Sequence, residues 1–218
     1  MAEEAEERVY TPRVDGGPWD VELDDIPESG GRHRLEKLQT VSLECEIPAR
    51  VTRVGLDARE GSSTVNSAYF GYSEHVGMAV SVHAVPADGV DRWSPEDSGL
   101  LDVHQGNEVE YTAERREGIM GEEFVVRGRN SECVICTHVA PPGYRWAMTV
   151  AAWNNNGSVS EQLMEDVYNT FATAVVTRGD RPIPPGASLS LALTGAAMEK
   201  HRAQMAQQHT GLSAIAGR

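Results

Sequence analysis

The stretch Val76-Gly-Met-Ala-Val-Ser-Val-His-Ala84 decides the fold class, because apolar side chains fall on every second residue. Successive side chains of a β-strand point to opposite faces, so this period of two predicts a strand with one apolar face. Met78, Val80, Val82 and Ala84 share that face, and Ser81 and His83 share the other.

Seven further segments carry strand signals and continue the pattern outward from this stretch. The expected strands are Val41–Ile47, Val51–Leu56, Ser67–Tyr72, Glu108–Thr112, Glu122–Arg127, Glu132–Val139 and Tyr144–Trp153. Turn residues such as Arg127-Gly-Arg-Asn130 and Pro141-Pro-Gly143 separate them. Consecutive strands joined by short turns predict antiparallel pairing in one sheet of six to seven strands.

One helix is clearly indicated after the last strand. Ser158 and Glu161 fit a capping box at its start, and Gly179 and the prolines after it indicate its end. Apolar residues then recur at every fourth position: Leu163, Val167, Phe171 and Val175. We therefore expect an α+β domain, a single mainly antiparallel sheet with a helix over Ser158–Val176 packed on it. Arg178-Gly-Asp180 is interpreted as the end of that helix rather than an adhesion motif.

Two weaker helices are expected outside this core. The first covers Ser94–His104, with Trp93 at its start, and the second covers Thr194–Gln208. We expect residues 1–31 to form an acidic extended arm, residues 32–185 the α+β core, and residues 186–218 a C-terminal extension that is helical from about residue 194.

Composition excludes several classes of function. The 218 residues carry a net charge of −14 with a pI near 4.9, which repels phosphate backbones and anionic lipids. No apolar run approaches the ~20 residues of a membrane span. The acidic start does not resemble a secretory signal, so we expect a cytoplasmic protein that binds neither nucleic acid nor membranes.

Cys133-Val-Ile-Cys136 is the motif that most resembles a redox or zinc site. Redox pairs of this spacing lie at helix N-termini, whereas this pair lies in an expected strand. Residues three apart on a strand face opposite sides, so the two sulfurs should point away from each other as reduced, buried thiols. Cys136 and His138 share a strand face, but no second ligand pair has the spacing of a structural zinc site. Nucleophile elbows and phosphate loops are also missing, so we expect no catalytic, cofactor or metal residues.

Two motifs near the ends carry a family resemblance. Gly17-Pro-Trp-Asp20 opens the matching region, and Val175-Val-Thr-Arg-Gly-Asp-Arg-Pro-Ile-Pro-Pro185 closes it, with Gly143-Tyr-Arg-Trp146 between them. These motifs resemble an actinobacterial family called domain of unknown function 3710, over about Gly16–Leu193. The family brings no established activity and no catalytic residues. The resemblance implies an antiparallel sheet flanked by helices, similar to the sandwich of Mog1/PsbP-like proteins, many of which are binding or assembly factors.

The favoured function is a non-enzymatic cytoplasmic interaction or accessory protein that binds a protein partner or itself. Its expected contact residues are Trp19, Trp93, Met198 and Met205. The first alternative is an enzyme or small-ligand binder with a pocket between sheet and helix, using His83, His138 or Cys136. The second alternative is a homo-oligomeric structural subunit.

Overall fold

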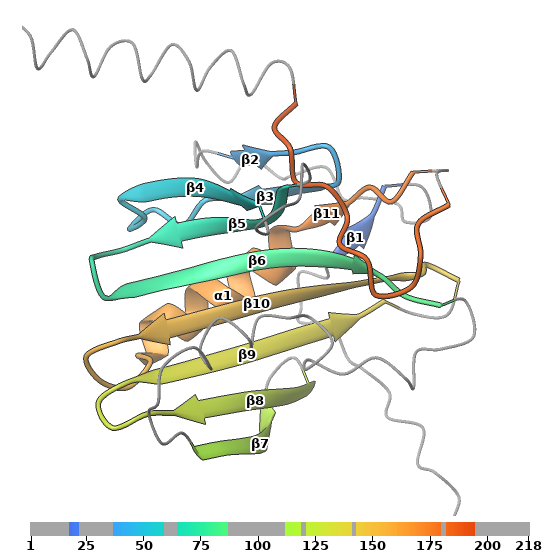
Figure 1. Cartoon of the computed structure of the whole chain (residues 1–218). Coiled ribbons are helices and arrows are strands. Elements are labelled where there is room, and N and C mark those ends of the chain that lie inside the picture. Colours follow the sequence, from blue (N-terminus) through green and yellow to red (C-terminus); the bar gives the residue numbers. More distant parts are fainter. Residues whose placement is uncertain are drawn as a thin grey trace, which may run out of the picture.

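Two β-sheets make up most of the described structure, and one helix lies behind the larger sheet, in contact with strands of both (Figure 1). The computed structural model describes residues 18–21, 37–58, 65–86, 112–118, 121–140, 143–179 and 182–194. The larger sheet has seven strands, all antiparallel, in the order β4-β5-β6-β10-β9-β8-β7. Its strands are β4 (Arg53–Ala58), β5 (Val65–Gly71), β6 (Val76–Ala84), β7 (Thr112–Gly118), β8 (Gly121–Arg127), β9 (Glu132–Val139) and β10 (Trp146–Asn154).

The smaller sheet has the order β1-β11-β3-β2. It combines three strands from the first 46 residues with β11, which follows the helix. It consists of β1 (Trp19–Asp20), β2 (Lys37–Gln39), β3 (Leu43–Glu46) and β11 (Val175–Val176). β1 pairs with β11 in parallel, with Trp19 opposite Val175 and Asp20 opposite Val176. The remaining pairs in this sheet are antiparallel.

The expected fold class was wrong in its number of sheets and its helix content. The fold is mostly β with two sheets, rather than one sheet flanked by helices. Alternation identifies strands but does not indicate which strands share a sheet. β1 and β11 have two residues each, too few for a period-two pattern to appear.

The helix α1 (Glu161–Thr173) is shorter at both ends than the expected helix over Ser158–Val176. Its N-cap is Ser160, whose hydroxyl accepts from the Leu163 amide at 3.2 Å, so the proposed capping box at Ser158 was wrong. After Ala174 the chain turns extended, and the β-branched pair Val175–Val176 joins a sheet instead of continuing the helix. Gly179, at φ +70°, therefore lies beyond the strand and does not cap the helix.

Leu163, Val167 and Phe171 are buried on the helix face, as predicted, whereas Val175 is half-buried in β11. In Figure 1 the helix lies behind the large sheet, across β6 and β10, and it packs on β10 and β3. The core beneath it includes the predicted face of β6: Met78, Val80, Val82 and Ala84.

The two faces of β9 confirm the prediction for the cysteine pair. Cys136 and Val134 belong to the core under the helix, whereas Cys133 and Ile135 belong to a second cluster on the opposite face. All three cysteines are free thiols and buried. The motif is therefore a product of alternating burial along a strand, and its two sulfurs do not meet.

The segment at 182–194 continues the core beyond the helix. Leu189 donates its amide to Val82 and Leu191 donates to Val65, so this segment runs beside the ends of β6 and β5. Both leucine side chains are fully buried. The expected helices over Ser94–His104 and after Thr194, most of the acidic arm, and the start of the expected strand at Glu108 lie outside the described residues.

Candidate functional site

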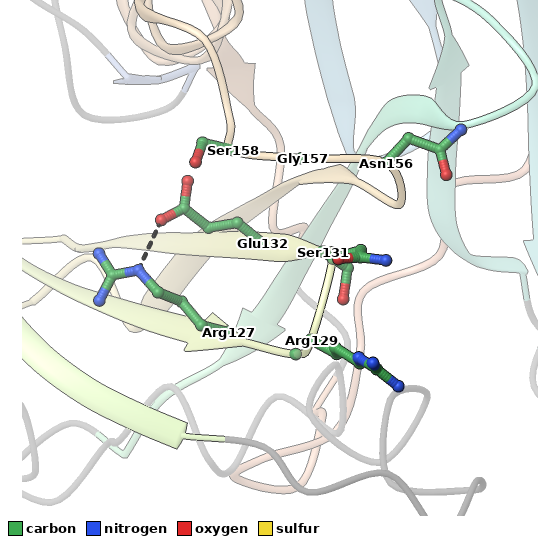
Figure 2. A pocket seen from close by; sticks show the side chains of 9 residues that line it. Arg127, Arg129, Ser131, Glu132, Asn156, Gly157 and Ser158 are labelled. Atoms are coloured by element: carbon green, nitrogen blue, oxygen red, sulfur yellow. Dashed lines mark hydrogen bonds and ion pairs between the residues drawn. The ribbon is translucent and has the colours of Figure 1, made fainter.

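A polar pocket lies between the turn that joins β8 to β9 and the connection from β10 to α1 (Figure 2). Its volume is about 560 Å³. The lining residues are Arg127, Gly128, Arg129, Asn130, Ser131, Glu132, Asn156, Gly157 and Ser158. This pocket is therefore formed by two loops. The ligand-binding hypothesis expected a pocket between sheet and helix, so its expected location was wrong for this pocket.

Local backbone bonds hold the two walls of this pocket together. Ser131 and Gly157 form a parallel β-bridge across it. On the second wall, the Asn154 side chain accepts from the Asn156 amide and donates to the Ser158 carbonyl, both at 2.9 Å. Gly157 has φ +152°, a backbone conformation that side-chain-bearing residues rarely adopt.

Glu132 ties the pocket wall to the start of the helix. Its carboxylate accepts from Arg127 Nε at 2.9 Å and from the Val159 amide at 2.7 Å. Arg127 also pairs with Glu114 of β7, and these two carboxylates raise the pKa of the guanidinium. Figure 2 shows Arg129 pointing away from the Arg127–Glu132 pair, and its side chain is exposed. The Arg127 side chain is thus held by two ion pairs, whereas the exposed Arg129 side chain places a positive charge at the rim of the pocket.

The residues of the ligand-binding hypothesis do not come together. His83 lies on the sheet face away from the helix, where Ser81 contacts its Nε2 at 2.9 Å. His138 and Cys136 lie on the helix side of β9, with the His138 ring 5.8 Å from that of Trp146. None of the three lines the pocket.

Burial also makes these groups unsuited to acid–base or nucleophilic chemistry at neutral pH. Loss of hydration lowers the pKa of both His83 and His138 to about 4, which keeps both rings neutral. The same effect raises the pKa of the Cys136 thiol well above its usual value, with the nearby Glu123 carboxylate adding to the rise. A reactive thiol needs the opposite environment.

Glu123 is a buried charge that the sequence analysis missed. It is only 1% exposed, yet it accepts from Tyr168 Oη at 2.7 Å and from Arg116 Nε at 2.8 Å. Gly118 leaves the space its carboxyl group needs, because a Cβ there would overlap it. The available signal was its parity, since Glu123 lies two residues before the core residue Val125. The site fastens β7 and β8 to the helix.

β7 forms one edge of the large sheet, and most of its residues are exposed. Its first six residues, Thr112 to Glu117, are all exposed, and among the described residues β7 pairs only with β8. Charged side chains occupy four consecutive positions, Glu114-Arg-Arg-Glu117. β4 forms the opposite edge, where Val54 is 36% exposed. Among the described residues neither edge strand pairs on its outer side, and such backbone groups could pair with another strand.

Of the expected contact residues, the structure describes only Trp19. This residue is half-buried in β1, and its amide donates to the Ala174 carbonyl at 2.8 Å. Trp93, Met198 and Met205 lie outside the described residues.

The opening and closing motifs meet in the small sheet. Asp20, 3% exposed, accepts from Trp146 Nε1 at 2.7 Å, which brings in the third motif as well. Arg145, just before this tryptophan, has φ +61°. A family model for a protein of unknown function, DUF3710, matches residues 17–200, from the opening motif to beyond the closing one. The chain belongs to the DUF3710 family. No curated protein matches it.

Within this DUF3710 chain, the described residues contain no group of three or more side chains that could hold a metal ion. Likewise, no helix in the described ranges is long and apolar enough to cross a membrane.

Proposed function

We propose that this DUF3710 protein is a non-enzymatic interaction or accessory protein of the cytoplasm, which contacts protein partners through the edges of its large sheet. The observation that carries the proposal is the exposure of every residue from Thr112 to Glu117 along the outer strand β7. Strand addition at such an edge supplies backbone hydrogen bonds to a partner, and the side chains supply specificity.

The placement of the reactive side chains supports a binding role over a catalytic one. Burial keeps His83 and His138 neutral and raises the pKa of Cys133 to about 12. Groups held in this way stabilise a core and cannot readily exchange protons with a substrate. The polar groups that solvent can reach lie instead on loops, on sheet edges and on the outer side of α1.

Site-specific photocrosslinking in cells tests the proposal. A benzophenone amino acid replaces Ala113 on β7, Val54 on β4, or, as a control, the exposed Glu165 on the outer side of α1. We expect adducts of discrete mass from at least one of the two edge positions and none from position 165. Equal labelling at all three positions, or no adduct from either edge, would contradict docking at the sheet edges.

Binding of a small polar anion is the second candidate, and the pocket of Figure 2 favours it. Arg129 supplies charge at the rim, and the Ser131 hydroxyl and the Asn130 amide supply hydrogen bonds. Titration with inorganic phosphate and with citrate, followed by amide chemical shifts of Gly128 and Gly157, tests this candidate. Shifts that saturate in the wild type and disappear in Arg129→Ala support it, whereas unchanged glycine shifts contradict it.

Four residues remain predicted contacts for a protein partner: Trp19, Trp93, Met198 and Met205. Alanine at each position, with the photocrosslinker kept on the sheet edge, measures whether these side chains add to binding.

A further inference from the structure

We infer that β4 pairs with β4 of a second copy of this chain, antiparallel across a two-fold axis at Gly55, so that two large sheets join into one. This inference rests on the proposed function and names the partner at that edge. Three observations support it: β4 pairs on one side only among the described residues, its charges have no counter-ion there, and its sequence is self-complementary on both faces.

β4 is a terminal strand of the large sheet, at the edge opposite β7 (Figure 1). Among the described residues it pairs with β5 alone, so the backbone groups on its other side can bind a further strand. Val54 on this strand is 36% exposed, one of three large apolar side chains in the described ranges that are exposed. A partner that completes this edge has to cover an apolar side chain as well as bind the backbone.

The two charged residues of β4, Arg53 and Asp57, are exposed and lie opposite uncharged residues. On β5, Gly71 lies opposite Arg53 and Ser67 lies opposite Asp57. Four residues along a strand separate the two charges by about 13 Å, so they cannot pair with each other. In the part of the chain that the structure describes, neither forms an ion pair. Their counter-ions must therefore come from outside this strand pair.

The guanidinium of Arg53 is already positioned for such a contact. Its central carbon lies 5.6 Å from the centroid of the Tyr69 ring, on the same face of the sheet. Stacking uses the flat face of a guanidinium, whereas its N–H donors lie in the plane and are not used by the ring. A carboxylate of a partner strand can therefore bind Arg53 without breaking its contact with Tyr69.

A second copy of β4 supplies the missing charges in one register. Residues opposite each other in an antiparallel two-fold pair lie on the same face, so the axis passes between a residue and its own copy. With Gly55 at the axis, Arg53 lies opposite Asp57 of the second copy, twice. Registers centred one residue to either side would place Gly55 opposite one of the charged residues instead. Charge complementarity thus selects the register centred on Gly55.

The same register pairs the apolar side chains on the opposite face. Val54 and Leu56 alternate with the charged residues and lie opposite the core residues Phe70 and Ala68 of β5. With Gly55 at the axis, Val54 lies opposite Leu56 of the second copy, twice. Such cross-strand pairs stabilise a sheet, and this one removes apolar surface of Val54 from water. One register therefore satisfies both faces of the strand.

Sedimentation velocity of the full chain across a concentration series tests this inference. We expect a monomer–dimer equilibrium that weakens as salt is added, because exposed charge pairs are screened. Arg53→Asp alone and Asp57→Arg alone should each raise the dissociation constant by about tenfold or more, because each replaces two attractive pairs by two repulsive ones. Circular dichroism and urea denaturation verify that the variants remain folded.

Recombination of the two charge changes is the decisive arm. The double variant R53D/D57R restores opposite charges at both pairs, so its dissociation constant should return towards that of the wild type. An equimolar mixture of the two single variants should form mixed dimers, although each variant alone resists pairing. Glu117→Arg on β7 makes the same change in net charge as D57R at the opposite edge and should leave dimerisation unchanged.

A wild-type chain that stays monomeric at every concentration would overturn the inference. A dimer that tolerates both single reversals, that the double variant fails to restore, or that Glu117→Arg disrupts instead would place the contact elsewhere and also overturn it. The photocrosslinking test stays separate. An adduct at Val54 of twice the chain mass is expected here, whereas an adduct of another mass would support the proposed function with a different protein at this edge.

Discussion

The carboxylate of Asp20 accepts a hydrogen bond of 2.7 Å from the indole nitrogen of Trp146, and both side chains are buried. These residues lie 126 positions apart, in the opening motif and in the first residue of β10. The bond therefore links the small sheet to the centre of the large one. A buried carboxylate that loses a donor retains the cost of its desolvation.

Asp20→Ala should lower the free energy of unfolding by about 1–3 kcal/mol, because the indole N–H loses its carboxylate acceptor. Urea denaturation monitored by tryptophan fluorescence measures the change. Asp20→Asn retains an acceptor oxygen and should cost less than the alanine variant. Equal loss in both variants would mean that charge or packing, and not this bond, accounts for the effect.

Phe171→Ala should destabilise the protein by about 3–5 kcal/mol, because the ring is fully buried between the helix and the sheets. Asn169→Ala on the same helix is exposed and should stay within about 0.5 kcal/mol of the wild type. Chemical denaturation of both variants provides the comparison. A small effect at Phe171 would contradict the packing of α1 described above.

Stability should fall as the pH is lowered from about 6.5 towards about 4. Burial lowers the pKa of His83 and His138 from the usual 6.5 to about 4, so the unfolded chain binds more protons within that window. The contribution of the buried neutral histidines to the free energy of unfolding is fully present above pH 6.5. Up to about 3 kcal/mol per histidine is lost between pH 6.5 and pH 4. Unfolding at stepwise pH, in the wild type and in His83→Gln and His138→Gln, measures this slope. Each variant should show a shallower slope, and an unchanged slope would contradict the assignment.

The three thiols should resist modification in the folded protein. Burial raises the pKa of Cys45 and Cys133 to about 12, so few thiolates form at neutral pH. A chromogenic disulfide reagent should label all three cysteines rapidly in guanidinium and very slowly without it. Rapid reaction of one thiol in the native protein would reveal a reactive cysteine and revive the redox hypothesis.

The end of the packed core can be located by two changes on either side of Thr194. Deletion of residues 195–218 should shift the melting temperature by about a degree or two at most. Leu191→Ala, in contrast, should cost about 2–5 kcal/mol, because Leu191 is fully buried in the main core. A large loss on deletion would show that the C-terminal extension is part of the stable fold.

Most strands of the large sheet could be predicted from the sequence, because alternation reports directly on a buried face. The paired faces of β6 and the opposed cysteines of β9 follow from that period alone. The small sheet as a whole could not be predicted, since Trp19–Asp20 pairs with Val175–Val176, and Val175–Val176 pairs also with β3, across long distances in the sequence. At Val175 the four-residue spacing was misleading, because it continues the helical stripe after the backbone has turned extended at Ala174.

The candidate sites could not be predicted either, because they depend on contacts between segments that are distant in the sequence. Glu123 escaped detection because a carboxylate in a strand normally indicates a solvated face. Its burial depends on Tyr168 and Arg116, which come from an element later in the chain and one earlier. The pocket depends on two loops that no local pattern brings together.

The parallel pairing of β1 with β11 has a consequence for the order of events on the ribosome. Trp19 leaves the ribosome early, yet its partner Val175 is among the last core residues to be synthesised. At elongation rates of ~5–20 residues per second the delay is on the order of 10–30 s, far longer than a local hairpin needs to form. The nascent chain can form β4 to β10 in sequence before the Trp19–Asp20 strand has its β11 partner. Closure of the small sheet therefore follows synthesis of the strands of the large sheet, and a translation product truncated before Val175 would leave the Trp19–Asp20 strand without its β11 partner.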